Sequence, residues 1–204
     1  DRLLQYGTHA LGLMWHPPYA HPEVVRYTLP EYPLFSGMCN GNDGLKQFYP
    51  GERLTSRDAI ERVFLIGNRF EFPMSHRPPE LADDWQRRIV ALRRACHPEM
   101  SRGDFLDDLG LGATPARVEA RWFRHPERTR VVVTLLDRRE PHERTAWDLD
   151  VDLASAVEGH PRRAWMQTLD TSRDLAIGQA PDGRLRLHLE PFEGRVAALF
   201  LEVP

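Results

Sequence analysis

Lysine is nearly missing from this chain, because Lys46 is the only lysine among 27 basic residues. The other cations are arginines, whose planar guanidinium groups match phosphate oxygens in pairs. However, the arginines alternate with carboxylates and form no basic stripe of the kind that follows a nucleic-acid backbone. Since the formal net charge is -3, we expect no nucleic-acid partner and attribute the arginine bias to GC-rich coding.

Cysteine and long apolar runs are also scarce. Cys39 and Cys96 lie far apart, so they cannot form a zinc site by themselves, and we expect both to be reduced. No apolar run approaches the roughly 20 residues that a membrane helix needs, so no membrane partner is expected. The chain starts at Asp1 without a signal-peptide pattern. We therefore expect either upstream processing or a piece of a longer polypeptide.

Motifs for several enzyme classes are missing as well. The chain contains no Gly-x-Ser-x-Gly elbow for a serine nucleophile, no glycine-rich loop that cradles phosphate and no dinucleotide-binding fingerprint. We therefore expect no nucleotide cofactor, and the residue pattern indicates no other cofactor.

The first half of the chain has the features of an α/β segment. Residues 9–15 and 24–29 are apolar stretches that predict strands, and each is followed by proline, which ends a β-ladder. Residues 35–51 carry glycine at positions 37, 41, 44 and 51. This composition predicts a long loop of the kind that often serves a function.

Two helices are predicted next. Thr55 with Asp58 resembles a capping box, apolar residues then recur at helical spacing, and Gly67 is placed to end the helix. A second amphipathic helix is predicted over residues 79–97. Its apolar face comprises Leu81, Trp85, Ile89, Leu92, Ala95 and Cys96, and its polar face comprises mainly Asp83, Asp84, Arg87, Arg88, Arg93 and Arg94.

After Gly112 the pattern changes to short strands. Residues 145–153 alternate strictly, with apolar side chains on one face and three aspartates on the other. Turn signals such as Pro181-Asp182-Gly183 separate the strands, and no helix is expected in this half. The predicted strands are 117–124, 130–137, 145–153, 164–169, 185–189 and 196–203. This series is typical of an antiparallel sandwich.

The first fifty residues are dense in aromatic side chains and in polar groups. Sugars present C–H faces that stack on aromatic rings, and histidine, asparagine and aspartate bind hydroxyl groups. We interpret the following residues as candidate sugar ligands: Trp15, His16, Tyr19, Asn40, Asn42 and Asp43. The alternative is that most of the aromatic rings fill a core.

Glu31 is the candidate catalytic residue. It follows Pro30, where a predicted strand ends, and catalytic groups of α/β barrels lie at the C-terminal ends of strands. Glycoside hydrolysis requires two carboxylates that flank the scissile bond. Asp43 and Glu71 are candidate companions, but no motif supports either one. The alternative for Glu31 is a solvated loop glutamate.

Two groups of residues resemble metal ligands without forming a recognisable site. His16, His21 and Glu23 are loosely spaced and interrupted by prolines. The three aspartates of residues 145–153 have the chemistry of calcium ligands, but residues two apart on a strand form a solvated face just as readily. We expect no metal.

With these residues in view, the chain resembles the C-terminal portion of a barrel-type glycoside hydrolase of the α-amylase and α-galactosidase kind. Arg26-Tyr27-Thr28-Leu29-Pro30-Glu31 looks like a late barrel strand that ends in a carboxylate. The segment 85–111, with Arg93-Arg94 and Gly103-Asp104-Phe105-Leu106-Asp107, looks like the last barrel helix and its exit. The β-rich remainder is similar to the sandwich that commonly caps these barrels.

The resemblance implies an α/β partial (β/α) barrel segment over residues 1–112 and an all-β antiparallel sandwich domain over residues 113–204. It also implies a carbohydrate substrate, and it implies that this chain supplies one wall of the sugar-binding cleft. A whole barrel needs roughly 250 residues, so the missing N-terminal barrel portion is expected upstream, and hydrolysis by this chain alone is not expected. The rival interpretations are a non-catalytic carbohydrate-binding or protein-interaction sandwich module and a purely structural protein.

Overall fold

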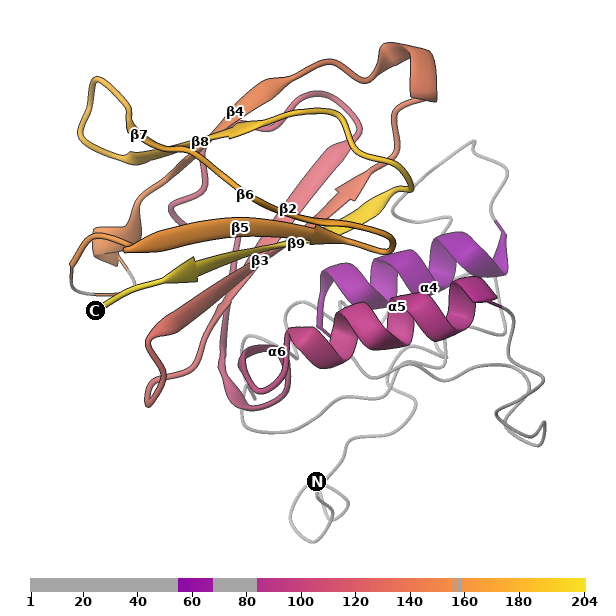
Figure 1. The fold of residues 1–204 in the computed structure, drawn as a ribbon, viewed down its shortest axis with the longest axis horizontal. Helices are drawn as coiled ribbons and strands as arrows, with labels where there is room; N and C mark the ends of the chain where they lie inside the picture. The colour runs from indigo at the N-terminus through magenta and orange to yellow at the C-terminus, as the bar shows by residue number, and fades with distance from the viewer. Residues whose placement is uncertain (1–54, 68–83, 156, 158) are drawn as a thin grey trace, which may run out of the picture.

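The computed structural model describes residues 55–67 and 84–204, except residues 156 and 158. This part of the chain forms three layers: helices, a six-stranded sheet and a three-stranded sheet (Figure 1). The helices α4 (Ser56–Leu65) and α5 (Asp84–Ala95) pack on one face of the larger sheet, and the smaller sheet packs on the other. A short helix, α6 (Glu99–Arg102), leads from α5 into the sheet.

All strand pairs in both sheets are antiparallel, in agreement with the predicted sandwich. The larger sheet has the spatial order β1 (Asp104–Asp107), β2 (Val118–Arg124), β3 (Arg130–Asp137), β9 (Val196–Glu202), β5 (Arg163–Thr168) and β6 (Ser172–Asp174). The smaller sheet has the order β4 (Trp147–Val151), β8 (Leu185–Leu189) and β7 (Ile177–Gln179). Two 3-10 turns, η3 (Pro141–Glu143) and η4 (Leu153–Ser155), flank β4.

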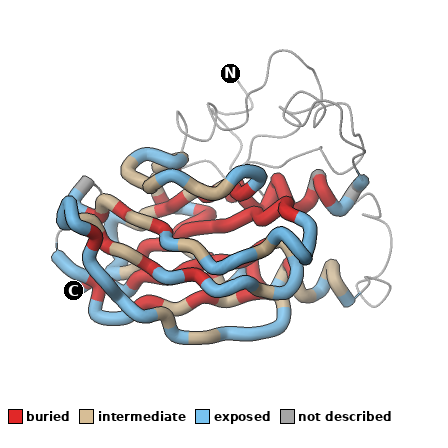
Figure 2. The backbone as a smooth tube through the Cα atoms, turned by 90° about the horizontal axis from the view of Figure 1, so that it is seen from above, coloured by how far each residue is buried: buried red, intermediate tan, exposed pale blue. Residues whose placement is uncertain are grey.

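The first hydrophobic core lies between the two sheets. It contains Leu149 and Val151 of β4, as the alternation of residues 145–153 predicted, together with the fully buried Trp122 of β2. Figure 2 shows buried positions along the strands and exposed positions at the connecting turns. Fully burying a leucine or valine side chain, such as that of Leu149 or Val151, stabilises the fold by about 1.5–3 kcal/mol relative to leaving it exposed.

A second core lies between the larger sheet and the helices. Ile60 and Phe64 of α4 and Ile89 and Leu92 of α5 pack with residues on the outer face of the sheet, among them Phe200. The apolar face predicted for the second helix is therefore confirmed within the described residues. Both faces of the larger sheet are thus covered by apolar side chains.

The central strands β3 and β9 show the consequence of this double burial. Val131 to Asp137 are all buried, and so are Val196 to Leu201. A strand covered on both faces has a continuous apolar sequence instead of an alternating one, because neither face meets solvent. The runs Val-Val-Val-Thr-Leu-Leu and Val-Ala-Ala-Leu-Phe-Leu have this character.

The ends of α4 confirm the sequence signals. The Thr55 backbone N–H donates to a carboxylate oxygen of Asp58 at 2.7 Å, and the Asp58 N–H donates to the Thr55 hydroxyl at 3.3 Å, which completes a capping box. Gly67 follows the helix with φ of 73°, and a Cβ there would lie 2.6 Å from the ring of Phe123. Glycine is therefore required both by the backbone conformation and by the close packing.

Polar contacts fasten the helices to the sheet and to each other. The buried Thr134 hydroxyl in β3 donates to the Leu65 carbonyl of α4 at 2.7 Å. Arg93 of α5 donates to the Gly67 carbonyl at 2.8 Å. Arg93 is 8% exposed, so its predicted place on the polar face is wrong. The guanidinium turns inward because it can satisfy a carbonyl at the end of the neighbouring helix.

Arg130, at the start of β3, holds the end of α5. Its guanidinium donates to both carboxylate oxygens of Glu99, at 2.9 and 2.7 Å, and Glu99 is 1% exposed. The same side chain donates to the carbonyls of Ala95 and His97 at 3.1 and 3.2 Å. A cation here complements the negative end of the helix dipole while it pairs the buried carboxylate.

Several elements differ from the sequence-based expectations. The segment 103–107, interpreted as the exit of a barrel helix, contains the edge strand β1, which pairs with β2. The short strands β6 and β7 were not predicted. The division between residues 112 and 113 stays a prediction, as does the barrel, whose predicted strands 9–15 and 24–29 lie outside the described residues. No helix in the described part is long and apolar enough to cross a membrane.

Candidate functional site

The residues predicted to bind sugar or to catalyse lie outside the described part of the chain. They are Trp15, His16, Tyr19, Glu31, Asn40, Asn42 and Asp43. Their roles therefore stay predictions, and so does that of the companion carboxylate Glu71. Within the described residues, polar side chains gather at a pocket beside the smaller sheet, on the outer face of that sheet, and where α4 meets the sandwich.

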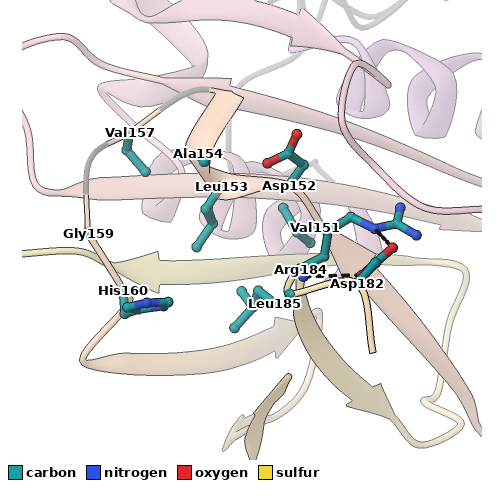
Figure 3. A pocket seen from close by; sticks show the side chains of 11 residues that line it. Val151, Asp152, Leu153, Ala154, Val157, Gly159, His160, Asp182, Arg184 and Leu185 are labelled. Atoms are coloured by element: carbon teal, nitrogen blue, oxygen red, sulfur yellow. Dashed lines mark hydrogen bonds and ion pairs between the residues drawn. The ribbon is translucent and has the colours of Figure 1, made fainter. Parts of the chain in front are cut away.

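The pocket has a volume of about 650 Å³ and lies beside Val151 and Leu185, which pair at the ends of β4 and β8 (Figure 3). Residues from two segments line it, one leaving β4 through η4 (151–154, 157, 159 and 160) and one running from the turn between β7 and β8 into β8 (182–185). In Figure 3 the side chains of Leu153, Leu185 and His160 border the same space. Sequence analysis did not find this pocket, because its walls are separated by more than twenty residues.

A salt bridge within the turn between β7 and β8 holds together the part of the pocket lining that residues 182–185 form. The Arg184 guanidinium donates to one carboxylate oxygen of Asp182 at 2.7 Å, and the Arg184 backbone N–H donates to the other at 3.2 Å. These bonds, the backbone one first, hold the pKa of Asp182 below its ordinary value. Gly183 lies between them with φ of 88°, as the Pro-Asp-Gly turn signal predicted.

The outer face of the smaller sheet carries cross-strand ion pairs. Asp150 of β4 accepts two bonds from Arg186 of β8, at 2.7 and 2.9 Å. His188 lies 2.7 Å from Asp148 and 3.2 Å from Glu190, and these hydrogen bonds raise its pKa. Asp148 and Asp150 thus pair with cations across the sheet, as on a solvated strand face. Among the described residues, no group of three or more histidine, cysteine or acidic side chains is arranged to hold a metal.

An ionic network joins α4 to the sandwich. Arg195, which precedes β9, donates to a carboxylate oxygen of Asp58 at 2.7 Å, and the same nitrogen lies 3.2 Å from Oε2 of Glu61. Arg62 of the same helix pairs with Glu119 of β2. All three residues of α4 are buried, with exposed fractions of 7% or less. The network places two carboxylates around one guanidinium at the joint between the layers.

The two carboxylates of this network respond differently to burial. Burial raises the pKa of Glu61 from 4.5 to about 7, and the nearby Arg195 offsets this only in part. Among the described residues, no group donates a hydrogen bond to Oε2 of Glu61. Burial also acts to raise the pKa of Asp58, but bonds from Thr55 and Arg195 outweigh it and lower the pKa. Glu61 is therefore the carboxyl that takes up a proton near neutral pH.

Cys96, one of the two cysteines, is a free and fully buried thiol in the second core. Burial raises its pKa to about 12, so the side chain stays a thiol at neutral pH. A nucleophilic cysteine requires the thiolate and access to solvent. Cys96 therefore acts as an apolar packing residue.

Comparisons with known proteins find only distant structural likeness. No protein-family model matches the sequence, and no curated protein matches it either. Two of the solved structures that match part of this chain carry enzyme names. One is α-L-fucosidase isoenzyme 2 from Paenibacillus thiaminolyticus, at 12% identity and a TM-score of 0.34, over 57% of this chain and 17% of that one. The other is a cycloisomaltooligosaccharide glucanotransferase from a Paenibacillus species, complexed with cycloisomaltoheptaose.

The second structure is 14% identical, with a TM-score of 0.41, over 57% of this chain and 20% of that chain. Both neighbours are carbohydrate-active enzymes by name, and the matched part spans a fifth of their length or less. A likeness of this extent does not carry the activity of either enzyme over to this chain.

Proposed function

We propose that this chain is the C-terminal part of a carbohydrate-active glycoside hydrolase. In this proposal residues 1–112 belong to a partial (β/α) barrel and supply one wall of a sugar cleft, and the sandwich is a structural domain fixed to it. Trp15, Tyr19 and the polar groups of the glycine-rich loop bind sugar, and Glu31 is the local catalytic carboxylate. Cleavage requires a second carboxylate from the part of the barrel that this chain does not supply.

The observation that carries the proposal is the second core. The outer face of the larger sheet is buried against α4 and α5, so the sandwich is completed by helices from the N-terminal side of the chain. Thr134 and Arg130 add hydrogen bonds from β3 to these helices. A domain that supports a catalytic barrel needs such a fixed joint. A free-standing binding module, the rival interpretation, needs polar residues on that face, because exposed apolar patches of this kind cause association.

The proposal is tested by the response of Trp15 to sugars in the full chain. A panel of methyl glycosides of glucose, galactose, mannose, xylose and fucose is titrated while the Trp15 indole N–H resonance is followed. We expect the resonance to shift with at least one sugar, and the shift to be lost in Glu31→Gln. The control is Glu193→Gln, an exposed carboxylate of the sandwich, which should leave the shift unchanged.

Two results would overturn the proposal. In the first, no sugar of the panel moves the Trp15 resonance. In the second, Glu31→Gln and Glu193→Gln have the same effect on it, which would remove Glu31 from the cleft.

A further inference from the structure

The pocket beside β4 and β8 has no role in the proposed function, where the sandwich is structural. Its volume of about 650 Å³ falls within the roughly 300–1,000 Å³ that small-molecule sites occupy. It is built by a strand end, a 3-10 turn and a tight turn, all attached to the sandwich core. What it can bind follows from the chemistry of its floor and its rim.

The floor of the pocket is apolar and fixed. Leu153 and Leu185 are 7% and 8% exposed and belong to the core between the sheets, and Val157 packs against that core. Their positions are therefore set by the packing of the sandwich. An apolar surface of this kind suits the C–H face of a ring and disfavours a fully charged ligand, whose desolvation it would not offset.

The rim is polar and carries Asp152, Asp182 and Arg184, and the guanidinium of Arg184 is already paired with carboxylates. Arg184 is bonded to Asp182 at 2.7 Å and lies 3.9 Å from Asp150. An anionic ligand would have to compete with these carboxylates for the guanidinium, and a cationic one would have to compete with the guanidinium. A paired carboxylate still has free lone pairs, and a paired guanidinium still has N–H groups, so both can bond neutral hydroxyls.

His160 completes the rim on the opposite side from the ion pair. Its imidazole is exposed and borders the same space as Leu153 and Leu185 (Figure 3). The ring offers a flat face for stacking, and one nitrogen donates while the other accepts in the neutral form. The pocket thus combines an apolar floor, a planar ring and hydroxyl-binding groups.

We propose that this pocket is a sugar-binding site of the sandwich, formed by other residues than those proposed for the cleft. The ring of a neutral hexose or pentose packs its C–H face on Leu153 and Leu185 and places an edge against His160. Its hydroxyls bond to Asp182 and Arg184 at the other end. In this proposal the pocket binds sugar and takes no part in cleavage.

The test uses the full chain carrying Trp15→Ala, so that the proposed cleft does not contribute. The same panel of methyl glycosides is titrated while the methyl resonances of Val157 and Leu185 are followed. Ala154→Trp fills the pocket from an exposed position in its wall, and His160→Ala removes the imidazole. The matched controls are the exposed residues Ala146→Trp and His142→Ala, which lie outside the pocket lining.

The expected result is a saturable shift of both methyl resonances with at least one sugar, lost in Ala154→Trp, reduced at least several-fold in affinity by His160→Ala, and kept in both controls. Absence of any shift with the whole panel overturns the pocket proposal, and so does a shift that persists in Ala154→Trp. These results leave the Trp15 titration untouched, so failure of the pocket and failure of the cleft are distinguishable.

Discussion

The hydroxyl of Thr134, in the middle of the sandwich, donates a hydrogen bond to the carbonyl of Leu65, in the last turn of α4, at 2.7 Å. Thr134 is fully buried, and its register partners are Arg121 of β2 and Ala198 of β9. The bond therefore ties the helical layer to the interior of the larger sheet. It is a direct link between two segments that are 69 positions apart in the sequence.

Replacing Thr134 with valine tests the strength of this link. Valine has nearly the same shape, so Thr134→Val removes the hydrogen bond without leaving a cavity. We expect the free energy of unfolding to fall by about 1–3 kcal/mol, since a buried acceptor loses its donor. Urea denaturation of the full chain measures the change. Thr129→Val, at an exposed position, serves as the control, and equal stability of the two variants would contradict the role of the bond.

Glu61 makes stability depend on pH in a defined direction. Its pKa is about 7 in the folded chain and about 4.5 in the unfolded chain, so the folded state binds the proton more tightly. The stability that this tighter proton binding gives the folded state is fully present below pH 4.5 and is lost as the pH rises to about 7. The free energy of unfolding should fall over this range through Glu61, by an amount on the order of 3 kcal/mol.

Glu61→Gln isolates this contribution, because glutamine fills the same space and does not ionise. The variant should match the parent near pH 4.5 and exceed it in stability at pH 8, when denaturant unfolding is compared at both values. Glu127→Gln, an exposed substitution, should leave the pH dependence unchanged. A Glu61→Gln variant that is less stable than the parent at pH 8 would show that the ion pair with Arg195 outweighs the cost of burial.

The pair of Arg130 and Glu99 should contribute far more than the exposed ion pairs. Arg130→Met leaves the carboxylate of Glu99 buried without its cation, which costs about 3–5 kcal/mol in comparable buried pairs. Arg163→Met breaks a pair with Asp174 in which both side chains are more than half exposed, and such pairs contribute about 0–1 kcal/mol. Thermal and urea unfolding should separate the two variants clearly. Similar losses in both would contradict the structural role of Arg130.

Residues 113–204 should not form a stable monomer when they are produced alone. Removal of the N-terminal part uncovers Phe123, Val132 and Phe200 on the outer face of the larger sheet and removes β1 from its edge. We expect this fragment to aggregate or to bind a hydrophobic dye, in contrast to the full chain. Size-exclusion chromatography and dye fluorescence check this. A monomeric fragment with cooperative unfolding would favour the rival interpretation of an independent module.

Local patterns in the sequence predict much of the sandwich. The alternation of residues 145–153 identifies the buried face of β4, and the Thr55–Asp58 spacing identifies the start of α4, because both signals depend on neighbouring residues. The continuous apolar runs of β3 and β9 carried a further signal, namely burial on both faces. The sequence pattern alone groups these runs with the other sandwich strands, and it does not reveal the helical layer on the outer face.

The features that the sequence does not reveal depend on contacts between distant segments. The pairing of Asp150 with Arg186 requires the register of β4 against β8, which nothing in either strand specifies by itself. Arg93 belongs by its charge to the polar side of a helix, and only the nearby end of α4 explains its burial. The pocket also depends on distant segments. The sequence identifies Asp182 as a turn residue, but it does not show that this residue lines a pocket.

Saturation-transfer NMR between the intact chain and the panel of methyl glycosides tests whether this chain binds carbohydrate. We expect transfer to at least one sugar, weakened when Trp15→Ala and Ala154→Trp are introduced separately and abolished when they are combined. Absence of transfer to every sugar of the panel would contradict both the proposed cleft and the pocket of the sandwich.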